Sequence, residues 1–173
     1  RRRQRQMCIR DRAQHAGWAQ WKQMLSENAV WRFLLCVTLM QGAHAAYYGF
    51  SAIYWQEAGY SSGTVGYLWS LGVVAEIIIF AASHRLFRRW SASDLLLLSC
   101  ISALVRWSIM ASSTDLGWLI AAQILHCGSF TLCHLAAMRF IAARDGGEVI
   151  RLQSVYSALA MGGGIALMTM VCG

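Results

Sequence analysis

The stretch GYLWSLGVVAEIIIFAASHRLFRR, residues 66–89, decides the fold class. It begins with about twenty largely apolar residues, which is the length that an α-helix needs to cross a bilayer. It ends with three arginines, which are typical of the polar edge of such a helix. One acidic residue, Glu76, lies near its middle. Because burying a carboxylate among apolar groups is costly, Glu76 raises the question of what it does there.

The whole chain has the composition of a membrane protein. Of its 173 residues, 57% are hydrophobic and 13% are charged, against roughly 25% charged residues in soluble domains. This leaves too little polar surface to cover a water-soluble core, which indicates an all-α polytopic membrane protein with the lipid bilayer as its surroundings. The formal net charge is +7, but the basic residues punctuate apolar segments and form no long stripe. Nucleic acid is therefore not an expected partner.

The apolar runs predict five transmembrane helices, at residues 29–55, 64–83, 92–112, 116–143 and 150–173. Ser91 and Asp94 stand at the spacing of a capping box and mark the start of the third helix. Lys and Arg occur before the first helix, between the second and third, and between the fourth and fifth, but not in the other two loops. This alternation predicts that the basic loops are cytoplasmic.

The N-terminal flank does not fit this pattern. Residues 1–17 carry six arginines within the first twelve positions and lack the apolar core of a signal peptide. We expect this segment to be a non-native flank, and we expect the chain to be a piece of a longer protein.

Three titratable side chains on three predicted helices are expected at one depth. With a rise of about 1.5 Å per residue, Glu76 lies about 13 Å from the cytoplasmic face, His44 about 18 Å from that face, and His126 about 15 Å from the opposite face. Glu76 is the only carboxylate at membrane depth, and such carboxylates tend to mark ion or proton pathways. Its alternative role is a permanent ion pair, either with Arg106 or with a residue in the rest of the longer protein. The two histidines equally fit a packing role.

One face of the first predicted helix carries polar and aromatic side chains at a 3-4-3-4 spacing: Gln41, His44, Tyr48, Ser51 and Trp55. Such a face points away from lipid, toward other helices or a wet cavity. Tyr47 and Tyr48 also fit simple packing or interfacial anchoring. Arg106, on the third helix, fits either a role inside the protein or a side chain that extends outward to the interface.

A metal site is not expected. The stretch HCGSFTLCH, residues 126–134, holds two histidines and two cysteines, all of them zinc ligand types. At about 100° per residue, they fall on two faces of a helix about 80° apart, so one helix cannot place all four around one ion. No cofactor is indicated either.

Three segments carry a family resemblance. They are QGAHAAYYGFSAIYWQEAGYSSGTVGYLWSLGVVAE (41–76), QILHCGSFTLCHLAAMRFIAAR (123–144) and EVIRLQSVYSALAMGGG (148–164). The chain resembles bacterial phenylpropionate permeases, the phenylpropionate/cinnamate proton symporter branch of the major facilitator superfamily. The resemblance implies a non-enzymatic transporter of twelve helices in two halves. Residues 29–173 would belong to its C-terminal half and residues 18–28 to the end of its central cytoplasmic loop, and the N-terminal half would be the missing partner.

The resemblance also implies proton-coupled uptake of a small aromatic carboxylate, such as 3-phenylpropionate, across the bacterial inner membrane. The roles of individual residues are inferred from their chemistry. We predict that Glu76, His44 and His126 couple the proton. The predicted substrate-binding residues are one cation, one amide and three aromatic side chains: Arg106, Gln41, Tyr47, Tyr48 and Trp55. The alternatives are a membrane-embedded enzyme or a permease-like sensor that uses Glu76, His44 and His126.

Overall fold

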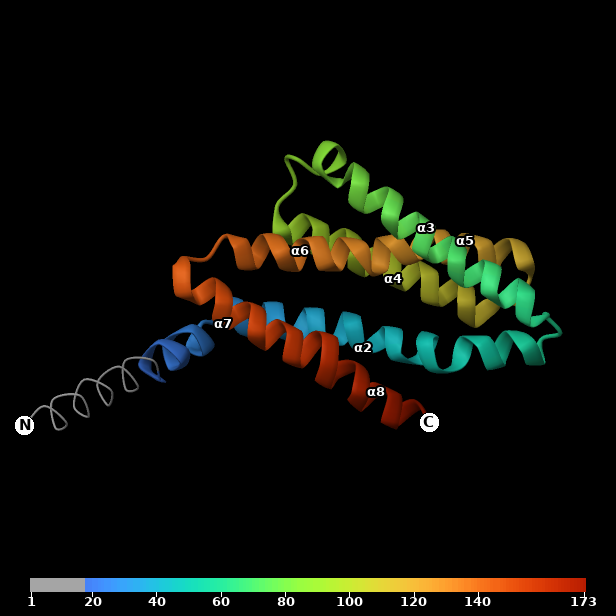
Figure 1. Ribbon diagram of the computed structural model, residues 1–173, viewed down its shortest axis with the longest axis horizontal. Helices are drawn as coiled ribbons and strands as arrows, with labels where there is room; N and C mark the ends of the chain where they lie inside the picture. Colours follow the sequence, from blue (N-terminus) through green and yellow to red (C-terminus); the bar gives the residue numbers. More distant parts are fainter. Residues whose placement is uncertain (1–17) are drawn as a thin grey trace, which may run out of the picture.

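The computed structural model describes residues 18–173, which form helices joined by short loops (Figure 1). The expected non-native flank, residues 1–17, lies outside the described residues. Residues 18–26 are helical. The helices that follow are α2 (Asn28–Glu57), α3 (Ser62–Leu86), α4 (Ala92–Ser112), α5 (Leu116–Ser129), α6 (Thr131–Ala142), α7 (Gly146–Tyr156), the π-helix η1 (Ser157–Gly163) and α8 (Gly164–Cys172).

Within residues 18–173, four helical stretches are long and apolar enough to cross a membrane: Ser62–Leu86, Ala92–Ser112, Leu116–Ala142 and Gly146–Cys172. They correspond to the last four predicted spans. The first predicted span, residues 29–55, forms the 30-residue helix α2 but is not among these four. Gln41 and His44 interrupt its apolar run and lower its hydropathy.

Local signals set several helix boundaries. The third predicted helix, residues 92–112, is confirmed as α4. Its capping box is also present, since the Ser91 hydroxyl accepts from the Asp94 amide at 3.1 Å and Asp94 Oδ2 accepts from the Ser91 amide at 2.9 Å. The last helix begins four residues before the predicted start near residue 150. Helix α7 begins at Gly146, whose φ of +35° lets the chain turn directly into the helix.

Helix α3 extends beyond the predicted 64–83 at both ends. It starts at Ser62, because the Ser61 hydroxyl caps its first turn by accepting from the Thr64 amide at 3.2 Å. The fourth predicted span, residues 116–143, corresponds to the single helical stretch Leu116–Ala142, in which Phe130 separates α5 from α6.

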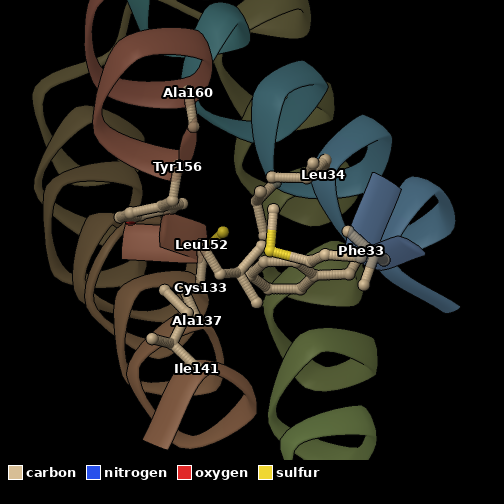
Figure 2. Packing of buried hydrophobic residues seen from close by; sticks show 11 residues of the cluster. Phe33, Leu34, Cys133, Ala137, Ile141, Leu152, Tyr156 and Ala160 are labelled. Atoms are coloured by element: carbon tan, nitrogen blue, oxygen red, sulfur yellow. The ribbon is translucent and has the colours of Figure 1, made fainter. Parts of the chain in front are cut away.

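The long helices run roughly along one direction and pack in two groups (Figure 1). Helix α2 packs along α8 and η1, while α4 packs on α5 and α6, and α3 packs on α5. The buried cluster near the α6–α7 turn joins the groups, and Figure 2 shows it: Met24, Val30, Phe33, Leu34, Val37, Cys133, Ala137, Ile141, Leu152, Tyr156 and Ala160. A second cluster, toward the other end of α2, contains Tyr47, Trp55, Val65, Leu68 and Leu119. Residues 38–46 of α2 and 120–132 of α5–α6 therefore lie between two apolar cores.

At Gly128, α5 approaches α4 closely. A Cβ at this position would lie 2.5 Å from Ser102 Oγ and 2.7 Å from Ser102 Cβ, closer than atoms can pack. One turn away along α4, the Ser99 hydroxyl donates to the Ser129 carbonyl at 2.9 Å and fixes the register of the two helices. The small residue at 128 thus brings the polar side chains of α5 close to α4.

We expect Gly128→Ala to destabilise the protein by about 1–3 kcal/mol, because the added methyl group overpacks the α4–α5 contact. Gly66→Ala in α3 is the matched control, since a Cβ there meets nothing within 4 Å. Thermal unfolding of both variants in detergent measures the difference. Equal unfolding temperatures would contradict the close approach of α4 and α5.

Candidate functional site

Glu76 and His126 form a close pair between α3 and α5. Glu76 Oε1 lies 2.8 Å from His126 Nε2, and the side chains are 17% and 4% exposed. Gly72, one turn before Glu76, explains how α3 comes so close. A Cβ there would already touch Gln123 Oε1 at 3.4 Å and His126 Cδ2 at 3.7 Å, so a larger side chain would push the helices apart. The pair can share one proton along its N–O axis.

His44 joins this pair from α2. Its ring lies edge-on to the His126 ring, with 5.1 Å between the centroids. His44 Nδ1 lies 2.8 Å from the Met40 carbonyl, which can only accept, so Nδ1 carries a hydrogen. His44 Nε2 is 3.3 Å from the Ser129 hydroxyl. The three titratable residues expected at one depth therefore meet from three different helices.

Glu76 does not pair with Arg106. Among the ion pairs of residues 18–173, the partner of Glu76 is His126. The first form of the expected alternative, a permanent Glu76–Arg106 pair, is therefore wrong for this structure, and a pair with a residue outside this chain stays a prediction. The reason is that α3 packs on α5, so that the carboxylate meets the histidine of α5 first.

Arg106 is completely buried on α4. Its guanidinium carbon lies 4.5 Å from the centroid of the Tyr47 ring and 5.3 Å from that of Trp107, at cation–π distance from both. The alternative of an outward-reaching side chain is therefore wrong, because the two aromatic faces hold the cation inside. None of the three guanidinium nitrogens has a hydrogen-bond partner within the described chain. Since buried charged groups are normally paired, the unpaired guanidinium of Arg106 is suited to bind an anion.

Tyr47 and Tyr48 lie beside these charged groups. The Tyr47 ring stacks on Trp69 at 5.4 Å and lies 5.1 Å from the His126 ring, as measured between centroids. Tyr48 is 40% exposed, and its ring centroid is 6.2 Å from that of His126. Tyr47 therefore connects Arg106 with the Glu76–His126 pair through its ring.

The remaining two predicted binding residues are buried but do not contact the Glu76–His126 pair or Arg106 in the interactions that the described residues make. Trp55 is buried in the second apolar cluster, and its ring centroid lies 6.1 Å from that of Tyr47. Gln41 is buried one turn before His44 and makes no hydrogen bond with the other site residues. The structure thus groups six of the eight predicted residues: Glu76, His44, His126, Arg106, Tyr47 and Tyr48.

Sequence reasoning missed three residues of the site. Gln123 accepts a hydrogen bond from the Tyr47 hydroxyl at 2.8 Å, and Phe130 stacks on His126 at 5.6 Å between centroids. Trp69, which stacks on Tyr47, is the third. Their spacing held a signal, because Gln123 and Phe130 stand three and four residues from His126, on the same helix face.

Within residues 18–173, the structure groups no three His, Cys, Asp or Glu side chains in a way that suits a metal ion. The HCGSFTLCH stretch is divided between α5 and α6 at Phe130.

These features can be set beside known proteins. The chain belongs to the MFS_1 like family, whose family model matches residues 2–173. Over 157 residues it is 69% identical to the "Probable 3-phenylpropionic acid transporter" of Escherichia coli (strain K12). This match covers 91% of the chain and 41% of the relative, so the chain spans about two fifths of the length of the curated relative it matches. No solved structure matches the chain.

Family membership and the four apolar helices together place the chain in a membrane that it crosses several times. The same family and the transporter relative indicate that the protein is not an enzyme.

Proposed function

We propose that the chain is part of a proton-coupled transporter that takes up a small aromatic carboxylate, such as 3-phenylpropionate, across the bacterial inner membrane. The observation that carries this proposal is the close Glu76–His126 pair, with His44 at 5.1 Å from His126 between ring centroids. The printed name of the Escherichia coli relative supports the choice of substrate.

In this proposal, the Glu76–His126 pair carries the proton. A carboxylate oxygen can accept a proton, and a neighbouring imidazole can give or take that proton. A proton loads from the outside, neutralises Glu76 and leaves on the inside when the site opens to the cytoplasm. His44 extends the path by one further imidazole.

The aromatic acid binds next to the proton site. Arg106 binds the carboxylate, because its buried guanidinium has no other partner within residues 18–173. Tyr47 and Tyr48 pack against the phenyl ring. Trp55, near the end of α2, and Gln41, near its middle, complete the site. Because Arg106 and Glu76 both lie near Tyr47 and His126, binding of the anion and of the proton favour each other electrostatically.

We also propose that α2 is a fifth span. It contributes His44 to the same cluster as α3 and α5, both of which belong to candidate spans, so it runs at their depth. Residues 29–173 would then belong to the C-terminal half of a twelve-helix transporter, after a central loop that ends at residues 18–28. An N-terminal half would complete the site, as in other transporters whose site lies between two repeats. The greater length of the relative supports this arrangement.

Uptake of labelled 3-phenylpropionate by cells that produce the complete transporter tests the proposal. We expect saturable uptake that other small aromatic carboxylates inhibit and that 3-phenylpropanol, which lacks the charge, does not inhibit. Saturable binding to membranes without uptake would instead favour the sensor. No saturable binding or uptake of any aromatic acid would contradict the proposed function.

A further inference from the structure

The side chains around Tyr47 hold an excess of unused hydrogen-bond donors. Arg106, Gln123 and Trp55 contact Tyr47, and Trp107 contacts Arg106. Three guanidinium nitrogens, the Gln123 side-chain nitrogen and both indole nitrogens are buried and have no partner within the described residues. All of these nitrogens donate hydrogen bonds, and none of them can accept one. The ligand that complements them is rich in lone pairs and negatively charged.

Gln123 is oriented so that its donor end is the free one. The Tyr47 hydroxyl donates to Gln123 Oε1 at 2.8 Å, which uses the acceptor end of the amide. The N–H₂ end is buried and unpaired, in a residue with no exposed surface. Tyr47 also presents its ring face to Arg106, so one tyrosine lies next to both unpaired groups.

Gln123 also lies next to the proton site. It precedes His126 by one helical turn on α5, and both residues face Gly72 of α3. Its amide therefore contacts Tyr47, the partner of Arg106, on one side and lies near the face of α3 that carries Glu76.

We propose that Gln123 is a second carboxylate-binding residue, whose side-chain N–H donates to one substrate oxygen while Arg106 binds the carboxylate as its counter-ion. The Tyr47 hydroxyl positions the Gln123 amide for this contact. The inference rests on the proposed function, and it adds a second donor, so that each oxygen of the carboxylate meets its own donor. An amide or alcohol in place of the carboxylate leaves Arg106 without a counter-ion and cannot satisfy the donors equally well.

The test is binding of two probes, 3-phenylpropionate and 3-phenylpropionamide, to the purified complete transporter by titration calorimetry. We expect Gln123→Met, which keeps the length and removes the amide, to weaken binding of the acid by about 10- to 100-fold. Binding of the neutral amide should change by less than about threefold. The ratio of the two affinities is the decisive readout, because a merely structural role would weaken both probes alike.

Tyr47→Phe provides a second variant that keeps the ring and the cation–π contact but releases the Gln123 amide. We expect it to weaken acid binding by about 3- to 10-fold, with little effect on the neutral probe. An unchanged acid-to-amide ratio in either folded variant overturns the role of Gln123. If the unmodified transporter binds no aromatic acid at all, the proposed function itself fails, so the two failures can be told apart.

Discussion

Replacing Glu76 by glutamine is expected to abolish uptake that is driven by a pH gradient, while exchange of substrate across the membrane continues. Glutamine resembles the protonated acid in shape and can still receive a hydrogen bond from His126 Nε2, which lies 2.8 Å from Glu76 Oε1. It cannot release a proton to the cytoplasm. Accumulation against a gradient should therefore fall to the level of cells without the transporter, whereas equilibrium exchange should stay within about threefold of normal.

Glu57→Gln is the matched control, because this carboxylate is exposed at the end of α2. It should leave both uphill uptake and exchange unchanged. A Glu76→Gln transporter that still concentrates its substrate at nearly the normal level would falsify the carrier role. If the variant instead fails to accumulate in the membrane, while Glu57→Gln accumulates normally, a structural Glu76–His126 pair is the better account.

Arg106→Met is expected to lower the affinity for the aromatic acid by more than about 100-fold, the effect of removing a charge-assisted hydrogen bond together with the counter-ion. The stability of the ligand-free protein should move the other way. Arg106 is buried, and its guanidinium has no hydrogen-bond partner in the described part of the chain, so methionine relieves an unfavourable burial. We expect its thermal unfolding temperature to be unchanged or higher.

The opposite signs distinguish a binding residue from a structural one. If the guanidinium is held by a carboxylate elsewhere in the complete protein, Arg106→Met would leave that carboxylate unpaired and lower the unfolding temperature. Arg88→Met, at an exposed arginine in the loop between α3 and α4, serves as the control and should change neither affinity nor stability. A loss of stability with unchanged affinity would contradict the assignment of Arg106 to the substrate.

Apolar runs and loop signals predicted much of the fold. The capping box of Ser91 and Asp94 gave the start of α4, since a local hydrogen-bond pattern needs only neighbouring residues. The number of residues between each side chain and the end of its helix predicted one depth for Glu76, His44 and His126, because helical rise is nearly constant. The contacts at 2.8 Å and 5.1 Å agree with that level. The proton-coupling role of the three residues stays a prediction.

Other features depend on how the helices pack. Hydropathy alone could not show that Gly72 and Gly128 bring α5 close to α3 and α4, and this closeness gives Glu76 its partner. The interior position of Arg106 depends on the rings of Tyr47 and Trp107, which come from two helices. The apolar run also gave no indication of the π-helix at Ser157–Gly163. Gln123 was missed because a single amide in an apolar helix does not reveal its partner.

The most direct test of the central claim is substrate accumulation in proteoliposomes that contain the complete transporter, with a pH gradient that is acidic outside. The external pH is kept near neutral, so that almost all of the 3-phenylpropionate is ionised and passive entry of the neutral acid is slow. Protein-free vesicles and Glu76→Gln vesicles give the background. We predict transient accumulation above both backgrounds, which disappears when the pH gradient is collapsed. Accumulation that equals the background, or that persists without the gradient, would contradict proton-coupled transport.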